Sequence, residues 1–165
     1  MGMVACFAGV DLATIARLKA NSNEVEEFLY PDDGDSEPAN YMDLDKAWHC
    51  IHFMLTGSAD DNSELLGCAI LGGDEIGEDC GYGPARIIEP KQVSAIAAAL
   101  AAIDEDNFKS RYAPDAMQAA DVYLADMCVR DGDEALDYIV QNYHRLTAFY
   151  RDAARREDGA ILWIC

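Results

Sequence analysis

Two histidines three residues apart on a short predicted helix are the first side chains in this sequence that could do chemistry. The stretch DLDKAWHCIHFMLTG places His49 and His52 at the i, i+3 spacing at which two helical side chains can share a site. A zinc site needs at least one more ligand, and the helical zincin motif adds a glutamate that is missing here. We therefore expect no metal site, a partly buried His52 bonded to a backbone group, and a more exposed His49.

The same stretch predicts a helix with one apolar face. If Asp43 is the N-cap, a rotation of about 100° per residue gathers four apolar side chains on one side. These four are Leu44, Trp48, Ile51 and Leu55. Cys50 and Phe53 lie off this face, so we expect neighbours on more than one side of the helix. Asp45 lies near the helix start, where the helix dipole favours a carboxylate.

A second cluster, CGYGPAR, combines turn-forming residues with an aromatic hydroxyl and a guanidinium. Gly81 and Gly83 flank Tyr82, and Pro84 follows, which predicts a rigid turn that leads to Arg86 at the start of a strand. A fixed tyrosine and arginine could bind a carboxylate or phosphate. The alternative is that Arg86 pairs with an acid of the preceding DEIGED segment and stabilises the loop.

The elements that must position these residues follow from apolar patterning. Strands are predicted at 3–10, 65–73, 85–89 and 160–165, and helices at 11–20, 24–30, 43–57, 90–103, 104–112, 114–129 and 131–157. Segments 31–40 and 74–84 are predicted to be loops. The predicted strands are apolar without clean alternation, which is typical of a sheet buried on both faces. We therefore predict a single α/β domain over residues 1–165, a three-layer α/β/α sandwich with helices on both faces of a central, mostly buried β-sheet.

The charge balance restricts the partners. Thirty-one acidic against twelve basic residues give a formal net charge of −19, which repels phosphate backbones and anionic lipid and attracts basic proteins. We expect no nucleic-acid binding and no membrane association. Six cysteines without a C-x-x-C pair, and an N-terminal segment without signal-peptide character, favour a cytoplasmic protein. No Walker loop, G-x-G-x-x-G or G-x-S-x-G motif is present, and we expect no cofactor.

Three segments together resemble the YfbM-like family of small bacterial proteins: MGMVACFAGVD, LDKAWHCIHFMLTG and ILGGDEIGEDCGYGPARIIEPKQV. The resemblance covers essentially the whole chain and matches at Asp45, Lys46, Trp48, His52, Thr56, Gly57, Gly81, Gly83, Pro84 and Arg86. It implies a three-layer α/β fold and a bacterial, cytoplasmic protein, but no mechanism, because the family has no agreed catalytic residues. Some relatives lack a histidine at the place of His49, which argues further against a two-histidine metal site.

Two functions of different classes follow. The first and favoured one is a non-enzymatic acidic binding protein, such as an immunity or inhibitor protein, that recognises a basic partner by electrostatic steering. It is an analogy based on size and charge, with steering by the acidic loop that contains Asp32, Asp33, Asp35 and Glu37.

The alternative is a small-ligand-binding protein or enzyme with a pocket between the Trp48–His52 helix and the Tyr82–Arg86 loop. His52 would act as general base and Arg86 would hold an anionic substrate. The candidate ligand- or partner-binding residues are Asp45, Trp48, His49, His52, Tyr82 and Arg86. The sequence leaves the oligomeric state open.

Overall fold

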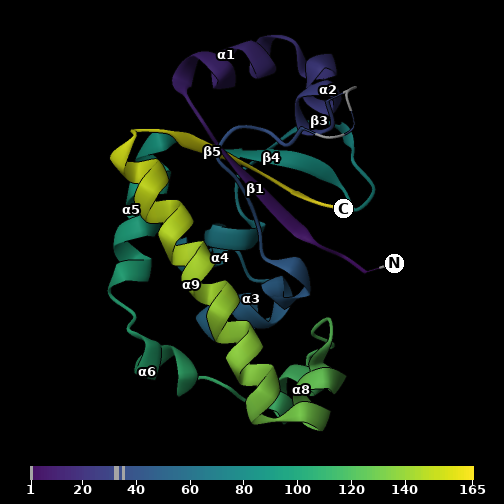
Figure 1. The fold of residues 1–165 in the computed structure, drawn as a ribbon, viewed down its shortest axis with the longest axis vertical. Helices are drawn as coiled ribbons and strands as arrows, with labels where there is room; N and C mark the ends of the chain where they lie inside the picture. The colour runs from purple at the N-terminus through teal and green to yellow at the C-terminus, as the bar shows by residue number, and fades with distance from the viewer. Residues whose placement is uncertain (1, 32–33, 35) are drawn as a thin grey trace.

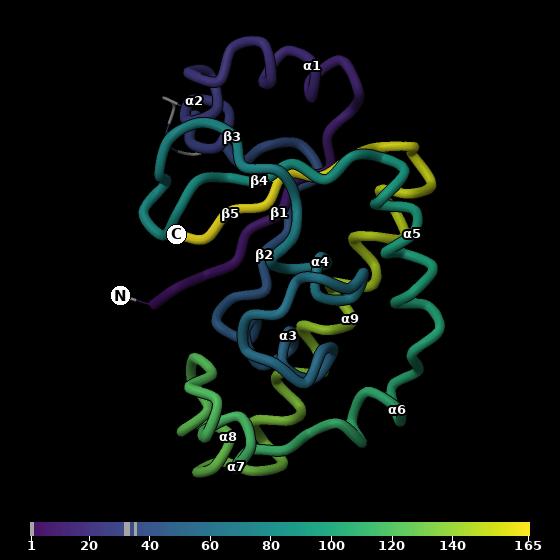
Figure 2. The backbone as a smooth tube through the Cα atoms, turned by 180° about the vertical axis from the view of Figure 1, so that it is seen from behind, coloured from purple at the N-terminus to yellow at the C-terminus, as the bar shows by residue number. Residues whose placement is uncertain are grey.

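A five-stranded antiparallel sheet lies at the centre of the computed structural model, which describes residues 2–31, 34 and 36–165. The strand order is β2-β1-β5-β4-β3, in which the strands other than β2 are labelled in Figure 1 and β2 is labelled in Figure 2. The strands are β1 Ala5–Val10, β2 Tyr41–Asp43, β3 Asp74–Asp79, β4 Pro84–Ile88 and β5 Gly159–Ile164. Strands β1 and β5 pair from Ala5–Ile164 to Val10–Gly159, so the two ends of the chain meet in the middle of the sheet.

Helices make up most of the remaining described residues. Those before β4 are α1 Leu12–Ala20, α2 Val25–Leu29, α3 Trp48–Thr56 and α4 Leu65–Leu71, with 3₁₀ turns η1 Ser22–Glu24 and η2 Asp45–Ala47. Those after it are α5 Pro90–Ala101, α6 Glu105–Lys109, α7 Pro114–Ala119, α8 Ala125–Asp131 and α9 Asp133–Arg155. None of the helices in the described ranges is long and apolar enough to span a membrane.

Buried side chains lie on both faces of the sheet, and strand β1 shows how. All six of its residues are buried. Because side chains alternate along a strand, Ala5 and Phe7 join a cluster that includes side chains of α3, α4, α5 and α9. Cys6, Ala8 and Val10 join a second cluster with side chains of α1 and α2. Figure 2 shows α1 and α2 apart from the larger helical group. The predicted α/β class is confirmed, whereas complete helical layers on both faces stay a prediction.

Three predicted elements were wrong. The single helix predicted at 114–129 is interrupted at 120–124 and forms two helices, α7 and α8. Residues 65–71 form helix α4 rather than a strand, because a short apolar run does not by itself distinguish a buried helix from a buried strand. Residues 74–79 form strand β3 rather than a loop. This strand lies at the sheet edge, and charged side chains on an edge strand block pairing with other chains. Its acidic sequence therefore reflects its edge position.

The start of the His49–His52 helix also differs from the prediction. Asp43 ends strand β2, and its Oδ1 accepts a hydrogen bond from the Asp45 backbone N–H at 2.9 Å. The 3₁₀ turn η2 follows, and α3 begins only at Trp48. The apolar face was nevertheless predicted correctly, because all four of its side chains are at least 95% buried: Leu44, Trp48, Ile51 and Leu55.

Candidate functional site

His49 lies beside Trp48 and is held by two backbone groups. The two rings stack with centroids 4.6 Å apart. The Nε2 of His49 lies 2.8 Å from the Ala59 carbonyl oxygen, and its Nδ1 accepts the Tyr123 backbone N–H at 2.8 Å. Since a carbonyl only accepts and an amide N–H only donates, the proton of the neutral ring must be on Nε2. Burial lowers the pKa of His49. Both nitrogens are used within the fold, so neither is available to a ligand.

His52 is fully buried, and neither ring nitrogen has a hydrogen-bond partner among the described residues. The backbone of Asp61 lies near the ring but outside hydrogen-bonding geometry. Burial, followed by the neighbouring His49, lowers the pKa of His52 to about 4. The expectation of a partly buried His52 bonded to the backbone was therefore wrong. The hydrogen bonds to the backbone are made by His49 instead. Helical spacing predicts the direction of each side chain, but it does not predict which loop packs against that side chain.

Arg86 supports the end of helix α4. Its Nη1 donates to the carbonyl oxygens of Ile70 at 3.1 Å and Gly72 at 3.2 Å. The neighbouring carbonyls are also bonded by side chains, from Tyr150 to Ala69 O at 2.7 Å and from Asn62 to Leu71 O at 3.0 Å. A cation at a helix C-terminus is favoured by the helix dipole. Glu75 lies opposite Arg86 across the β3–β4 pair, but no ion pair joins them among the described residues. Arg86 therefore satisfies backbone carbonyls rather than an acid of the DEIGED segment.

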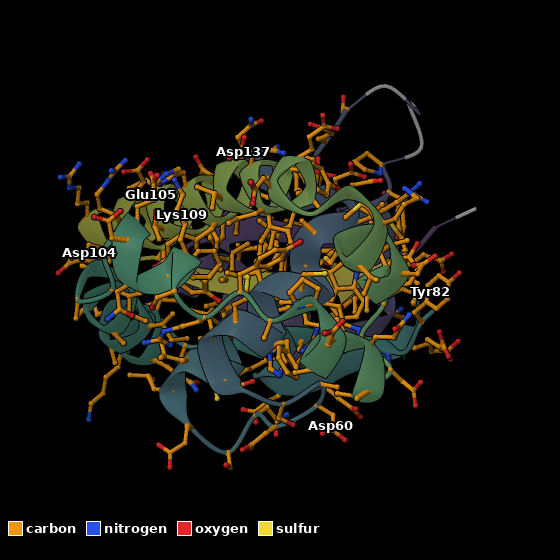
Figure 3. The ribbon with its side chains drawn as sticks, turned by 90° about the horizontal axis from the view of Figure 1, so that it is seen from below. Asp60, Tyr82, Asp104, Glu105, Lys109 and Asp137 are labelled. Carbon is orange, nitrogen blue, oxygen red and sulfur yellow. The ribbon has the colours of Figure 1, made fainter. Side chains whose placement is uncertain are left out.

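The turn between β3 and β4 is held by hydrogen bonds to its backbone, as expected for a rigid turn. Asp79 Oδ1 accepts the backbone N–H groups of Gly81 at 2.6 Å and Gly83 at 3.1 Å. Both glycines have positive φ angles, 124° and 95°, which favour glycine. The ring of Tyr82 is 52% exposed and lies at the rim of the molecule (Figure 3). The turn is thus fixed by its own acid, and the tyrosine faces solvent.

Asp45 connects the 3₁₀ turn η2 to the long helix α9. The hydroxyl of Tyr138 donates to Asp45 Oδ2 at 2.9 Å, and the backbone N–H of Lys46 donates to the same hydroxyl at 3.2 Å. Burial raises the pKa of Tyr138, and the Asp45 carboxylate raises it further. Tyr138 must be protonated to donate this hydrogen bond, and its raised pKa keeps it so. The Asp45–Tyr138 pair therefore links η2 to α9.

Of the six predicted site residues, Trp48 and His49 lie in direct contact and line one open cavity of about 560 Å³. The other lining residues are Gly57, Ser58, Ala59, Asp60, Leu71 and Ala120. His52, Tyr82 and Arg86 are not among them. Nor do three His, Cys, Asp or Glu side chains of the described ranges come close enough together to hold a metal ion. A site shared by His52 and Arg86 stays a prediction.

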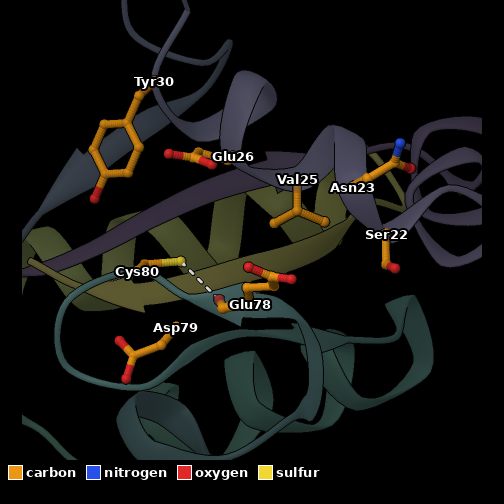
Figure 4. Close-up of a pocket in the computed structure, with 8 residues that line it drawn as sticks. All are labelled: Ser22, Asn23, Val25, Glu26, Tyr30, Glu78, Asp79 and Cys80. Carbon is orange, nitrogen blue, oxygen red and sulfur yellow. Dashed lines mark hydrogen bonds between the residues drawn. The ribbon is translucent and has the colours of Figure 1, made fainter.

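A different cavity, which the sequence reasoning missed, lies where α2 and η1 meet the edge strand β3. It has a volume of about 370 Å³ and is lined by Ser22, Asn23, Val25, Glu26, Tyr30, Glu78, Asp79 and Cys80 (Figure 4). Gly77 allows this contact, because its φ is 75° and a Cβ there would lie 3.0 Å from the Cβ of Val25. We call this cavity the acidic cleft.

The acidic cleft is lined by side chains that carry negative charge. Glu26 comes from α2, whereas Glu78 and Asp79 come from β3, and none of the three forms an ion pair with another described residue. Burial raises the pKa of Cys80, and the charges of Asp79 and Glu26 raise it further. The thiol therefore stays protonated near neutral pH, and the cleft offers carboxylates rather than a nucleophile.

The two segments that form this cleft are recognisable in the sequence by their acidic residues. Both EVEEFLY and DEIGED are acidic, but they are separated by about 50 residues and were read as a helix and a loop. Only the pairing of 74–79 as an edge strand, covered by α2, brings the two segments together.

Comparison with known proteins places the chain among proteins of unknown function. The profile of a family described as "Domain of unknown function (DUF1877)" matches residues 1–163. A crystal structure described as a protein of unknown function, YfbM from Escherichia coli, matches with a TM-score of 0.76 and 19% identity. The match covers 98% of this chain and 99% of that chain, and at this identity it shows the fold alone. No curated protein matches the chain.

Proposed function

Because this chain belongs to the DUF1877 family, whose function is unknown, we propose its function from its own surface. The protein is a non-enzymatic acidic binding protein, such as an immunity or inhibitor protein, that recognises a basic protein. A lysine or arginine of the partner enters the acidic cleft. The observation that carries the proposal is the convergence of Glu26, Glu78 and Asp79 on one cavity, where none of them forms an ion pair with a cation of the described ranges.

The size of the cleft supports a single side chain as its occupant. Its volume of about 370 Å³ lies at the lower end of the range for ligand pockets, about 300–1,000 Å³. Carboxylates on two sides suit a guanidinium, which can donate to more than one of them. Tyr30, which is 44% exposed at the rim, can pack on the flat face of such a group.

Protection of the sheet edge alone does not account for this arrangement. Exposed acids on β3 are useful against edge-to-edge pairing wherever they point. Glu26, however, belongs to α2 and faces the same cavity from the opposite side (Figure 4). An acid on the covering helix adds nothing to edge protection, whereas it adds a second wall of negative charge to a binding site.

The overall charge supports rapid association with a basic partner. The formal net charge is −19, and exposed acids such as Asp60, Asp104 and Asp137 lie around the rim of the molecule (Figure 3). A field of this sign raises the encounter rate with a basic protein. Of the loop acids that we expect to contribute to steering, Glu37 lines a cavity next to Tyr30. Asp32, Asp33 and Asp35 lie outside the described residues.

Three observations favour binding over catalysis. His52 is closed to solvent, both nitrogens of His49 are bonded to the backbone, and Cys80 is held as a thiol. The alternative, a ligand pocket between α3 and the Tyr82 turn, would also need Arg86 to leave the α4 carbonyls.

A pair of matched triple variants tests the proposal. The cleft variant carries Glu26→Gln, Glu78→Gln and Asp79→Asn, of which the last keeps an oxygen that can accept from the turn. The control variant carries Glu64→Gln, Asp115→Asn and Glu134→Gln, three exposed acids outside the cleft, and so has the same net charge. Each immobilised protein is incubated with lysate of the source organism, washed with a salt series and analysed by mass spectrometry.

We expect a basic protein that the wild type and the control variant retain at low salt and that the cleft variant retains at least about tenfold less, the loss of roughly one charge-assisted contact. Equal loss from both variants would show that net charge alone retains the partner. Retention of no basic protein by the wild type would refute the proposed function.

A further inference from the structure

Two cysteines from opposite ends of the chain lie side by side on one face of the sheet. The Sγ atoms of Cys6 and Cys165 are 3.7 Å apart. Cys6 of β1 is paired with Trp163 of β5, and Cys165 exchanges two backbone hydrogen bonds with Val4, at 2.8 and 3.0 Å. Since side chains two residues apart share a face, Cys165 is the diagonal neighbour of Cys6. Figure 2 shows the end of β5 beside the start of β1.

We propose that Cys6 and Cys165 are a site of reversible oxidation, at which a hydroperoxide converts the two thiols into an intramolecular disulfide. This goes beyond the proposed binding function and does not depend on it. In the first step the sulfur of Cys165 attacks hydrogen peroxide, an S–O bond forms, the O–O bond breaks and one water is released. The sulfur of Cys6 then attacks the sulfenic acid of Cys165 and displaces a second water. Two electrons pass from the two thiols to the peroxide.

Access decides which thiol reacts first. Cys165 is exposed, whereas only 3% of Cys6 is exposed. Both line a cavity of about 260 Å³ together with Tyr30, Tyr41 and Trp163, which opens a path for a small oxidant. Cys165 is therefore the residue that meets the peroxide, and Cys6 is the resolving thiol.

The surroundings of Cys6 hold it as a thiol while the pair is reduced. Burial raises its pKa to about 12, although the hydrogen bond with the Tyr41 hydroxyl acts in the opposite direction. The hydroxyl of Tyr41, 3.4 Å from Cys6 Sγ, can donate to a thiolate that forms there. Tyr41 can thus stabilise the Cys6 thiolate that attacks the sulfenic acid of Cys165.

A second pair in the same molecule provides an internal control. The Sγ atoms of Cys50 and Cys128 are also 3.7 Å apart, but both residues are fully buried. The pKa of Cys128 is lowered to about 7, mainly by its hydrogen bond with Cys50, so acidity alone would favour this pair. If access controls the reaction, the Cys6–Cys165 pair must react first.

The test exposes the reduced full-length protein to excess hydrogen peroxide for increasing times. The remaining thiols are alkylated under denaturing conditions, and non-reduced peptides are mapped by mass spectrometry. We expect loss of two of the six free thiols, a Cys6–Cys165 peptide two hydrogens lighter than the sum of its parts, and recovery of both thiols with dithiothreitol. The crosslink joins almost the whole chain into one loop, so the midpoint of thermal unfolding should rise by up to about 10–20 °C.

Variants make the outcome decisive. Cys165→Ser, a change at an exposed position, should abolish the linked peptide without unfolding the protein, and Cys50→Ser should leave its formation unchanged. Overoxidation of Cys165 with Cys6 still free to be alkylated would overturn the proposal. So would a Cys50–Cys128 link that forms earlier, or a link between two chains only.

Discussion

Replacing His52 by leucine should stabilise the protein, although the change removes a buried side chain of the α3 core. The ring is fully buried and both nitrogens lack hydrogen-bond partners among the described residues. Each unsatisfied buried polar group costs about 1–3 kcal/mol, whereas an apolar group of similar size has no such cost. Imperfect packing of leucine in a histidine-shaped space costs up to about 1.5 kcal/mol. We therefore expect His52→Leu to raise the free energy of unfolding by about 1–3 kcal/mol at pH 7.5.

The pH dependence gives a sharper test. The pKa of His52 falls from 6.5, its ordinary value, to about 4 in the folded protein. Between these two values the unfolded chain binds a proton that the folded chain does not bind, so stability falls as the pH falls from 6.5 towards 4. The slope is about 1.4 kcal/mol per pH unit, which amounts to about 2 kcal/mol at pH 5 and about 3 kcal/mol at pH 4. The leucine variant lacks this contribution, so its advantage over the wild type should widen as the pH falls.

Urea unfolding followed by far-UV circular dichroism at pH 7.5, 6.5, 5.5 and 5.0 measures both effects. Ile51→Val is the matched control, because Ile51 is a fully buried neighbour on the same helix that does not titrate. It should cost about 0.5–1.5 kcal/mol at every pH and give a curve parallel to that of the wild type. A curve for His52→Leu that is also parallel to the wild type would refute the reasoning. A variant less stable than the wild type at pH 7.5 would show that the His52 nitrogens do form stabilising hydrogen bonds in the folded protein.

Three further substitutions test the backbone arguments by the same urea measurement. Tyr150→Phe removes the hydroxyl that donates to the Ala69 carbonyl at 2.7 Å, and the unsatisfied carbonyl at the end of α4 should cost about 1–3 kcal/mol; no loss would mean that another donor takes its place. Gly77→Ala places a Cβ at a φ of 75° and 3.0 Å from Val25, so we expect a loss of at least about 1–2 kcal/mol and a shift in the chemical environment of α2, readable by NMR. Asp11→Ala removes the side-chain cap of α1 and should cost about 0.5–2 kcal/mol; the exposed Asp115→Ala in the first turn of α7, which loses only the interaction with the helix dipole, should cost less, about 0.3–1 kcal/mol.

Local patterns in the sequence were sufficient for several elements. The apolar face of α3 was correct because burial repeats with the helical period, whatever the neighbours are. Pro90 marks the start of α5, and Asp11 caps α1 through its bond to the Thr14 N–H, because these signals act within one turn of the helix. Segment 85–89 was predicted as a strand and largely coincides with β4.

Elements whose identity depends on distant contacts were not predicted. Helix α4 has an apolar sequence that suits a strand equally well, and it is helical with its final carbonyls bonded by Arg86, Tyr150 and Asn62. Strand β3 has an acidic sequence that reads as a loop, and it is a strand because β4 supplies its hydrogen bonds.

The sequence by itself determined the α/β class, the family resemblance, the acidity and the apolar face around Trp48, since composition and short-range periodicity encode them. Only the tertiary structure decided the chemistry of each candidate residue. His49 is bonded to Ala59 and to Tyr123, which lies 74 residues away, while His52, three positions along, has no partner in the described structure. Cys6 lies beside Cys165, 159 residues away in the sequence, and Glu26 and Glu78 line one cavity only because α2 covers an edge strand. The periodicity of a helix or strand determines the direction of a side chain, whereas the residue that contacts this side chain comes from a distant part of the chain.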